Sequence, residues 1–235
     1  MIEPRSYRSK FPVGFPIENW KPAGTPTRTP IFGSWCRLEP LNGEIHGNSL
    51  FEEFSEDTNA ALWTYLPYGP FENVEDFKNW IKKNCLGSDP LFHAIIDPHT
   101  NRALGVASYL RINQSSGVIE VGHINYGPKL QQSRAGTEVM YLMMKHAFDD
   151  LGYRRYEWKC DALNERSRKA AVRLGMTFEG LFRQATIYKN RNRDTAWYSI
   201  LDCEWPQMKN AFEKWLAPGN FLKNGEQIGH LNDFK

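Results

Sequence analysis

Residues 118–138 read VIEVGHINY, then GPKL, then QQSRAGTE. The β-branched residues over 118–126 predict a strand, and the small and polar residues after it predict a turn that opens a helix. At such a helix N-terminus, free backbone N–H groups and the positive end of the helix dipole attract an anion. Phosphate is the natural ligand of this arrangement, although a turn that only caps the helix explains these residues equally simply.

The segments around this stretch show both strand and helix periodicity. Besides 118–126, strand patterns lie at 35–41, 91–97, 103–112, 155–160, 178–187 and 195–201. Helical patterns lie at 46–59, 74–86, 137–151, 165–174 and 205–216. This order predicts an α/β (mixed α+β) fold with a central mixed, mostly antiparallel sheet of about seven strands flanked by helices.

The chain of 235 residues is predicted to form a single domain at 35–217. A Pro- and Gly-rich stretch at 1–34 predicts an irregular arm, and 218–235 predicts a polar tail. The N-terminal segment lacks an apolar core and no later window reaches the length of a membrane span, so we expect a cytoplasmic protein without a membrane partner.

Charge and cysteine content exclude several classes of function. The net charge of +2 is too small to imply nucleic acid as an obligate partner. The four cysteines are far apart in sequence, with no Cys-x-x-Cys and no neighbouring His cluster, so we expect no metal site and no disulfide framework. They are Cys36, Cys85, Cys160 and Cys203. P-loop, Rossmann and nucleophile-elbow motifs are absent from the sequence.

The predicted anion site resembles the acetyl-CoA pyrophosphate loop of the GNAT acetyltransferase superfamily, written Q/R-x-x-G-x-G/A. Gln131 stands at its start and Gly136 at its end, whereas Arg134 occupies a position where glycine is usual. This departure either adds a cation near the phosphates or distorts the loop.

A second motif resembles the family's N-x-x-S/A followed by a helix and L-G-F. It starts with Asn164 and Ser167 and ends with Leu174-Gly175-Met176. Together with Gly180 and the Trp-containing strand at 195–199, the pattern looks most like the branch of ribosomal-protein N-terminal acetyltransferases. The resemblance extends over about residues 35–206.

The resemblance implies an N-acetyltransferase in which a primary amine, on a protein N-terminus or a small molecule, directly attacks acetyl-CoA in a ternary complex. It also implies that strand 118–126 diverges from strand 155–160, that the pantetheine arm lies in the gap, and that a backbone N–H near 123–125 polarises the thioester carbonyl. The residues expected to contact acetyl-CoA are Ile124, Asn125, Gln131, Arg134, Ala135, Gly136, Thr137, Asn164 and Ser167.

A primary amine is mostly protonated at neutral pH, so a general base is needed. The candidates are Glu120 and His123, which stand three residues apart on a strand and are therefore expected on opposite faces. We favour Glu120 slightly because carboxylates commonly serve this role in the family, while an ion-paired Glu and a hydrogen-bonded His are equally good interpretations. Where related enzymes carry an acidic tyrosine this chain has Ala171, so the proton donor is left open between Ser167, a tyrosine elsewhere and none.

The acceptor site is expected between the first two helices, where Trp63, Tyr65 and Tyr68 form an aromatic run. Packing in the hydrophobic core explains these three rings equally well. Near the C-terminus, Trp205 and Trp215 fit either a homodimer surface or the packing of the last helix.

Two other classes of function stay open. A non-catalytic acyl-CoA-binding sensor is suggested by Arg134 and Ala171, which both depart from the family pattern. An RNA-binding module is less favoured, and is suggested by basic residues of 183–193 near Tyr188 and Trp197.

Overall fold

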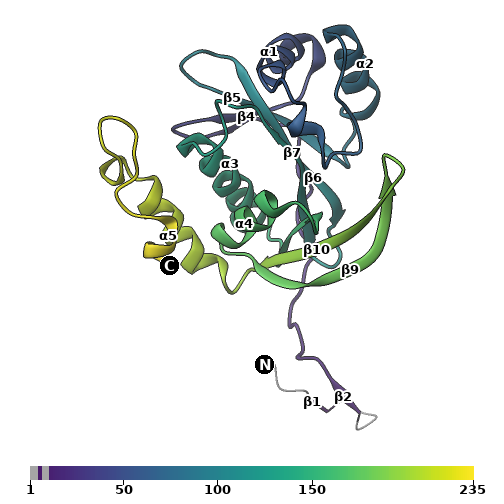
Figure 1. Cartoon of the computed structure of the whole chain (residues 1–235). Coiled ribbons are helices and arrows are strands. Elements are labelled where there is room, and N and C mark those ends of the chain that lie inside the picture. Colours follow the sequence, from purple (N-terminus) through teal and green to yellow (C-terminus); the bar gives the residue numbers. More distant parts are fainter. Residues whose placement is uncertain (1–4, 7–10) are drawn as a thin grey trace.

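The computed structural model describes residues 5–6 and 11–235, and within this part an eight-stranded sheet carries helices on both faces (Figure 1). The strand order is β3-β4-β5-β6-β7-β8-β10-β9. Every neighbouring pair is antiparallel except β7 and β8, which are parallel. The predicted mixed, mostly antiparallel α/β fold is thus confirmed. The additional strand is the two-residue β3, which is too short to show any periodicity.

The elements follow the chain in the predicted order. The strands are β1 (Arg5–Ser6), β2 (Pro12–Val13), β3 (Ile31–Phe32), β4 (Arg37–Pro40), β5 (Leu91–Ile96), β6 (Ala103–Asn113), β7 (Val118–Tyr126), β8 (Arg155–Asp161), β9 (Thr177–Tyr188) and β10 (Arg191–Leu201). The helices are α1 (Gly43–Ser55), α2 (Val74–Asn84), α3 (Arg134–Lys145), α4 (Glu165–Arg173) and α5 (Trp205–Leu216). Shorter turns of helix are η1 (Ala61–Trp63), the π-helical η2 (His146–Asp150), η3 (Pro218–Asn220) and η4 (Leu231–Phe234).

Helix-capping side chains explain where the predicted boundaries were wrong. The helix expected at 137–151 begins at Arg134, because the Ser133 hydroxyl accepts the N–H of Gly136 at 2.9 Å. The helix expected at 46–59 begins at Gly43, because the Asn42 side chain accepts the N–H of Glu44 at 2.9 Å. In both cases the capping residue lies outside the hydrophobic pattern used to draw the boundary.

The sheet separates two hydrophobic clusters. One cluster packs α3, α4 and α5 against one face and includes Ile119 and Val121 of β7. The other packs α1 and α2 against the opposite face and includes Phe92 of β5. Side chains on a strand alternate between faces, so each β7 residue can be assigned to one of these two sides.

The ends of the described chain pack differently. After α5 the chain turns back through η3, a bridge between Phe221 and Gln227, and η4, and buries Leu231 against α5. Trp205 and Trp215 lie on the buried face of α5, so they form no exposed surface. At the other end, residues 11–19 lead away from the domain (Figure 1), and Trp20 Nε1 donates to the Ser115 carbonyl at 2.8 Å. None of the described helices is both long and apolar enough to cross a membrane.

Candidate active site

The central feature of the site is a gap between two parallel strands. β7 and β8 pair only from Val118 with Arg155 to Val121 with Trp158. Beyond this point β7 continues through Gly122–Tyr126 without a ladder to β8, so its edge on that side is open. An open cleft of about 2710 Å³ passes along this gap. The divergence that the family resemblance implied is therefore present in the fold.

One end of the cleft is the N-terminus of α3. In the described residues the backbone N–H groups of Arg134 and Ala135 have no acceptor, since Ser133 caps only Gly136 with its side chain and Thr137 with its carbonyl. These two free donors and the helix dipole make the turn suitable for an anion. The turn after β7 thus has the geometry of an anion site, while its ligand stays a prediction.

Small and polar residues hold this turn in shape. Gln131 Nε2 donates to the Tyr126 carbonyl at 2.8 Å, so its amide group braces the loop from within. A Cβ on Gly136 would lie 2.6 Å from the Leu130 carbonyl oxygen, so a side chain there would displace the backbone. The glycine of the motif is thus required by packing of the loop.

Two arginines lie near this turn, and their surroundings differ. The Arg134 guanidinium is stacked between the rings of Trp35, at 4.0 Å from the ring centroid, and Phe221, at 3.2 Å. It therefore joins the C-terminal segment to the domain. Arg173 is half-buried, its Nη1 donates to Thr137 Oγ1 at 3.1 Å, and it forms no ion pair with any described residue. Burial lowers the Arg173 pKa. Sequence reasoning missed Arg173, because α4 brings it to α3 only in the fold.

The N-terminus of α4 lines the same cleft. The Asn164 side chain caps this helix by accepting the N–H of Ser167 at 3.1 Å. The Ser167 hydroxyl accepts the indole N–H of Trp158 at 2.9 Å, where β7 and β8 separate. Both residues of the second motif thus border the gap. Further along β7, Asn125 is buried and its Nδ2 has no partner in the described residues, while Ile124 packs partly into the core.

A β-bulge in β7 overturns the expectation that Glu120 and His123 face opposite sides. Gly122 pairs with Ser108 and Asn125 with Val106, so two β7 residues oppose a single residue of β6. His123 takes a positive φ of 50° at this bulge, which turns its side chain onto the face of α1 and α2. Glu120 already faces that side, since its neighbours in the strand are in the opposite core. Both side chains therefore line one cleft.

His123 lies among aromatic rings. Its ring centroid is 4.9 Å from that of Phe92, and its Nδ1 is 3.2 Å from the Tyr68 hydroxyl. Burial, reinforced by the charge of Arg111, lowers the pKa of His123 to about 4. The imidazole is consequently neutral at physiological pH, and one ring nitrogen is available to accept a proton.

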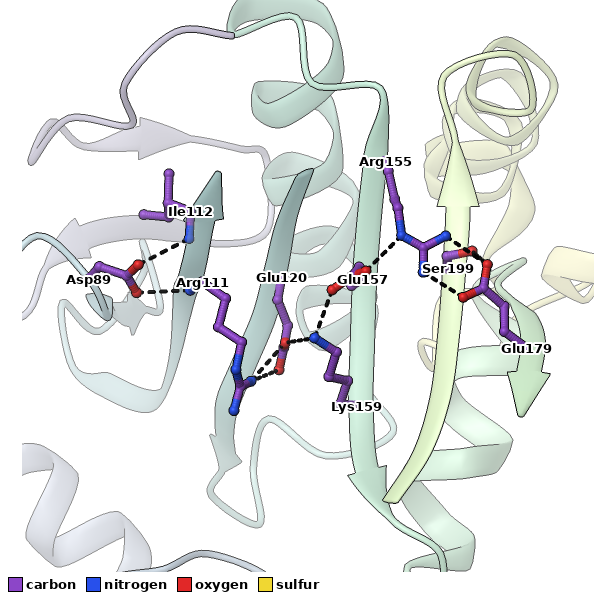
Figure 2. Close-up of polar contacts among 9 residues, drawn as sticks. All are labelled: Asp89, Arg111, Ile112, Glu120, Arg155, Glu157, Lys159, Glu179 and Ser199. Carbon is purple, nitrogen blue, oxygen red and sulfur yellow. Dashed lines mark hydrogen bonds and ion pairs between the residues drawn. The ribbon is translucent and has the colours of Figure 1, made fainter. Parts of the chain in front are cut away.

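Glu120 belongs to a chain of ion pairs across the sheet, shown in Figure 2. Arg111 Nη1 contacts both of its carboxylate oxygens, at 2.7 and 2.8 Å, and Lys159 Nζ lies 2.8 Å from one of them. Lys159 also pairs with Glu157 at 2.8 Å, and the chain continues through Arg155 to Glu179. Because Glu120 is only 3% exposed and already neutralised by two cations, the geometry favours His123 over Glu120 as the base.

The aromatic run expected to bind the acceptor is divided by the fold. Trp63 is 6% exposed and packs edge-on against Phe54 at 5.3 Å, so it is a core residue. Tyr68 contacts His123 through its hydroxyl group but does not itself line the cleft. Tyr65 alone of the three lines it, and its hydroxyl donates to the Leu163 carbonyl at 3.1 Å.

The β9–β10 hairpin supplies the wall that the sequence did not identify. It curves toward α1 and α2 (Figure 1), and Lys189 Nζ near its tip donates to the Trp63 carbonyl at 2.7 Å. Within the hairpin, Tyr188 donates its hydroxyl to Asp161 Oδ2 at 2.8 Å, across the end of β8. Burial and this hydrogen bond raise the pKa of Tyr188 to about 12. No sequence motif links these residues, which lie 27 or more positions apart.

The residues present fit acetyl-CoA. Free N–H groups and Arg173 can hold phosphate, while the open edge of β7 and the orphaned Asn125 amide can hold an extended polar chain. In the described part of the chain, no group of three or more His, Cys, Asp or Glu side chains could hold a metal ion.

Comparison with known proteins agrees with this geometry. A family model described as the acetyltransferase (GNAT) domain matches residues 37–177, more than half of the chain. The chain belongs to the GNAT acetyltransferase family. It is accordingly an acyltransferase, and the family uses acetyl-CoA.

Several relatives share the GNAT fold over most of their length. A GCN5-related N-acetyltransferase from Brucella melitensis is 44% identical, with 93% of this chain and 99% of that chain covered and a TM-score of 0.90. A probable GNAT-family acetyltransferase from Chromobacterium violaceum ATCC 12472 is 40% identical, with 83% and 98% covered and a TM-score of 0.77. The uncharacterized N-acetyltransferase YnaD of Bacillus subtilis (strain 168) is 24% identical over 153 residues, which are 65% of this chain and 86% of that protein.

More distant structures show the fold alone. One is described as a ribosomal-protein-serine acetyltransferase from Vibrio cholerae, at 16% identity, with 74% of this chain and 97% of that chain covered and a TM-score of 0.64. Another is the microcin C7 self-immunity acetyltransferase MccE in complex with acetyl-CoA and AMP, at 19% identity, with 72% and 93% covered and a TM-score of 0.63.

Proposed function

We propose that this protein is an N-acetyltransferase that moves the acetyl group of acetyl-CoA to a primary amine in a ternary complex. The observation that carries the proposal is the gap between β7 and β8. It joins the anion site at the start of α3 to the part of the cleft lined by His123, Tyr65 and Tyr188, which we call the acceptor chamber. Two substrates entering from opposite sides would meet where the strands separate.

The α3 turn is the proposed holder of the acetyl-CoA phosphates. The N–H groups of Arg134 and Ala135, together with Arg173, supply donors and positive charge. Gln131, Gly136 and Thr137 shape this turn rather than offering free charged groups. Arg134 thus acts through its backbone, while its side chain holds the C-terminal segment.

The open edge of β7 is the proposed holder of the pantetheine arm and the acetyl group. Ile124 and Asn125 lie on this edge, and Asn164 and Ser167 face it from α4. A backbone N–H next to the bulge at His123 would donate to the thioester oxygen and stabilise the charge that develops there. Acetyl-CoA supplies the activated acyl group, so no metal is required for this chemistry.

His123 is the proposed general base. With its Nδ1 proton donated to the Tyr68 hydroxyl oxygen, Nε2 is left to accept the proton that the amine loses as its nitrogen bonds to the carbonyl carbon. The carbon–sulfur bond breaks in the same reaction, and the CoA thiolate leaves. Tyr188 lines the cleft, but its hydroxyl donates to Asp161 and its pKa is raised to about 12, so we propose that the thiolate leaves without a proton donor from the protein.

We propose a primary amine as the acceptor, and we do not assign it to a ribosomal protein. The Vibrio cholerae structure described by that activity is 16% identical, which supports a common fold only. We further propose a cytoplasmic site of action, since Cys36, Cys85, Cys160 and Cys203 all carry free thiols.

The experiment that tests this function combines binding with turnover. Calorimetric titration measures acetyl-CoA binding, and a thiol-release assay on a panel of primary amines measures transfer, with mass spectrometry of the acetylated product. We expect binding, transfer to at least one amine, and intersecting initial-velocity lines. Tight acetyl-CoA binding without turnover on any amine would favour the sensor, and parallel lines would contradict a ternary complex.

A further inference from the structure

We propose that the acceptor chamber selects amines that also carry a carboxylate or similar anionic group, and that Arg193 of β10 recognises this group. The inference rests on the proposed function and specifies its substrate class. It starts from the charges of the chamber, most of which are neutralised by partners within the protein.

The floor of the chamber carries paired charges. Glu120 is held by Arg111 and Lys159, and Lys159 is shared with Glu157, so this group is close to neutral as a whole. Asp161 accepts the Tyr188 hydroxyl at 2.8 Å and the backbone N–H of Leu163 at 2.8 Å, which engages both of its oxygens. None of these groups offers a free charge to an incoming ligand.

Arg193 differs from these paired groups. Its side chain is half-buried, lines the cleft, and makes neither an ion pair nor a hydrogen bond with any described residue. Its Nε is fully buried and lacks a partner, and its closest aromatic neighbour is the Tyr188 ring, with the guanidinium carbon 5.9 Å from the centroid. The two Nη groups also lack a partner in the described part of the chain but are not fully buried, so an anionic ligand in the cleft can bind them and gain affinity.

A second cation, Lys189, lies near the tip of the same hairpin. Lys189 Nζ donates to the Trp63 carbonyl and has no carboxylate within 4.0 Å among the described residues. Burial lowers the pKa of Lys189. Lys189 does not line the cleft, so among the charged residues of β9 and β10 it is Arg193 that can meet a ligand there.

The shape of an arginine points to the ligand. A guanidinium forms two parallel hydrogen bonds to a carboxylate, and such charge-assisted bonds are stronger than neutral ones. The aromatic rings of Tyr65 and the exposed Phe182 line the chamber, and Phe182 stacks on Trp197 with centroids 4.2 Å apart. An amphoteric amine such as an amino acid, with its carboxylate on Arg193 and its body on these rings, fits the arrangement better than a neutral peptide N-terminus.

The test compares substrates that differ in this charge, with kcat/KM calculated on the concentration of unprotonated amine. Alanine and phenylalanine are assayed against their carboxamides, on the wild type, Arg193→Gln and Arg193→Lys. Arg191→Gln is the matched control, because Arg191 is on the same strand and exposed but does not line the cleft. We expect kcat/KM to favour the carboxylates by about 10- to 100-fold in the wild type and Arg191→Gln, and this preference to disappear in Arg193→Gln. Arg193→Lys should restore part of it.

A binding measurement keeps the two proposals separable. N-acetylphenylalanine and its carboxamide are titrated into the CoA-saturated protein and into the same variants. Arg193-dependent binding of the carboxylate without any turnover would sustain the anionic subsite and refute the acetyltransferase function. The subsite would be overturned if the wild type showed no preference for the carboxylate. It would also be overturned if Arg193→Gln, with acetyl-CoA binding unchanged, lost the same factor in kcat/KM on the carboxylate and on the carboxamide.

Discussion

The two ends of the cleft are built in different ways. At the acetyl-CoA end, the shaping contacts join residues that are close in sequence: Gln131 with Tyr126, Ser133 with Gly136, and Asn164 with Ser167. At the acceptor end they join residues that are far apart, such as His123 with Tyr68 and Lys189 with Trp63. The first end presents mainly backbone groups and the second mainly side chains. Single substitutions should therefore affect the acceptor end more strongly.

The largest effect is expected from His123→Gln. Loss of a general base lowers turnover about 10²- to 10⁴-fold, while acetyl-CoA affinity stays unchanged because this ring lies on the acceptor side. Since burial holds the His123 pKa at about 4, the imidazole is neutral throughout pH 6–9, and the loss should be similar at every pH in that range.

Steady-state kinetics across this pH range, with calorimetry of acetyl-CoA on the same samples, checks the prediction. A loss of less than about threefold in kcat would remove His123 from the chemistry. A parallel loss of acetyl-CoA affinity would show that the two ends are not separate in function.

Glu120→Leu should act on stability. It leaves Lys159, whose side chain is 8% exposed, with a single carboxylate, so we expect the free energy of unfolding to fall by about 3 kcal/mol. Urea unfolding at pH 7 measures it, with Glu179→Gln as a control at the more exposed end of the same ion-pair chain. Unchanged stability with lost turnover in Glu120→Gln would instead assign the base to Glu120.

Arg173→Gln tests which arginine binds the phosphates at the acetyl-CoA end. Removing this cation beside Thr137 should raise the acetyl-CoA Kd about tenfold with little effect on kcat. Arg134→Gln is the matched comparison, and should change Kd by no more than a few-fold, because its guanidinium is stacked between two rings. Calorimetry on both variants decides between the two arginines, and a larger loss in Arg134→Gln would reverse the assignment.

The same contrast explains how far sequence reasoning reached. The order of the elements and the α3 turn follow from local patterns of hydrophobicity, small residues and caps, and each was predictable. The bulge at His123 was not, because a slip of one residue against β6 leaves no mark on the alternation of β7 itself. Arg173 was missed, and Arg193 was considered only as part of a basic cluster, because the absence of a counter-ion beside each of them is visible only in the assembled fold.

Amide hydrogen exchange with and without acetyl-CoA tests the central claim most directly. The account predicts slower exchange in two segments, Gly122–Tyr126 on the open edge of β7 and 133–137 at the start of α3, with little change in the hairpin at 185–195 until an amine or its acetylated product is added. Protection confined to the hairpin, or absent from the α3 turn, would contradict the assignment of the two ends.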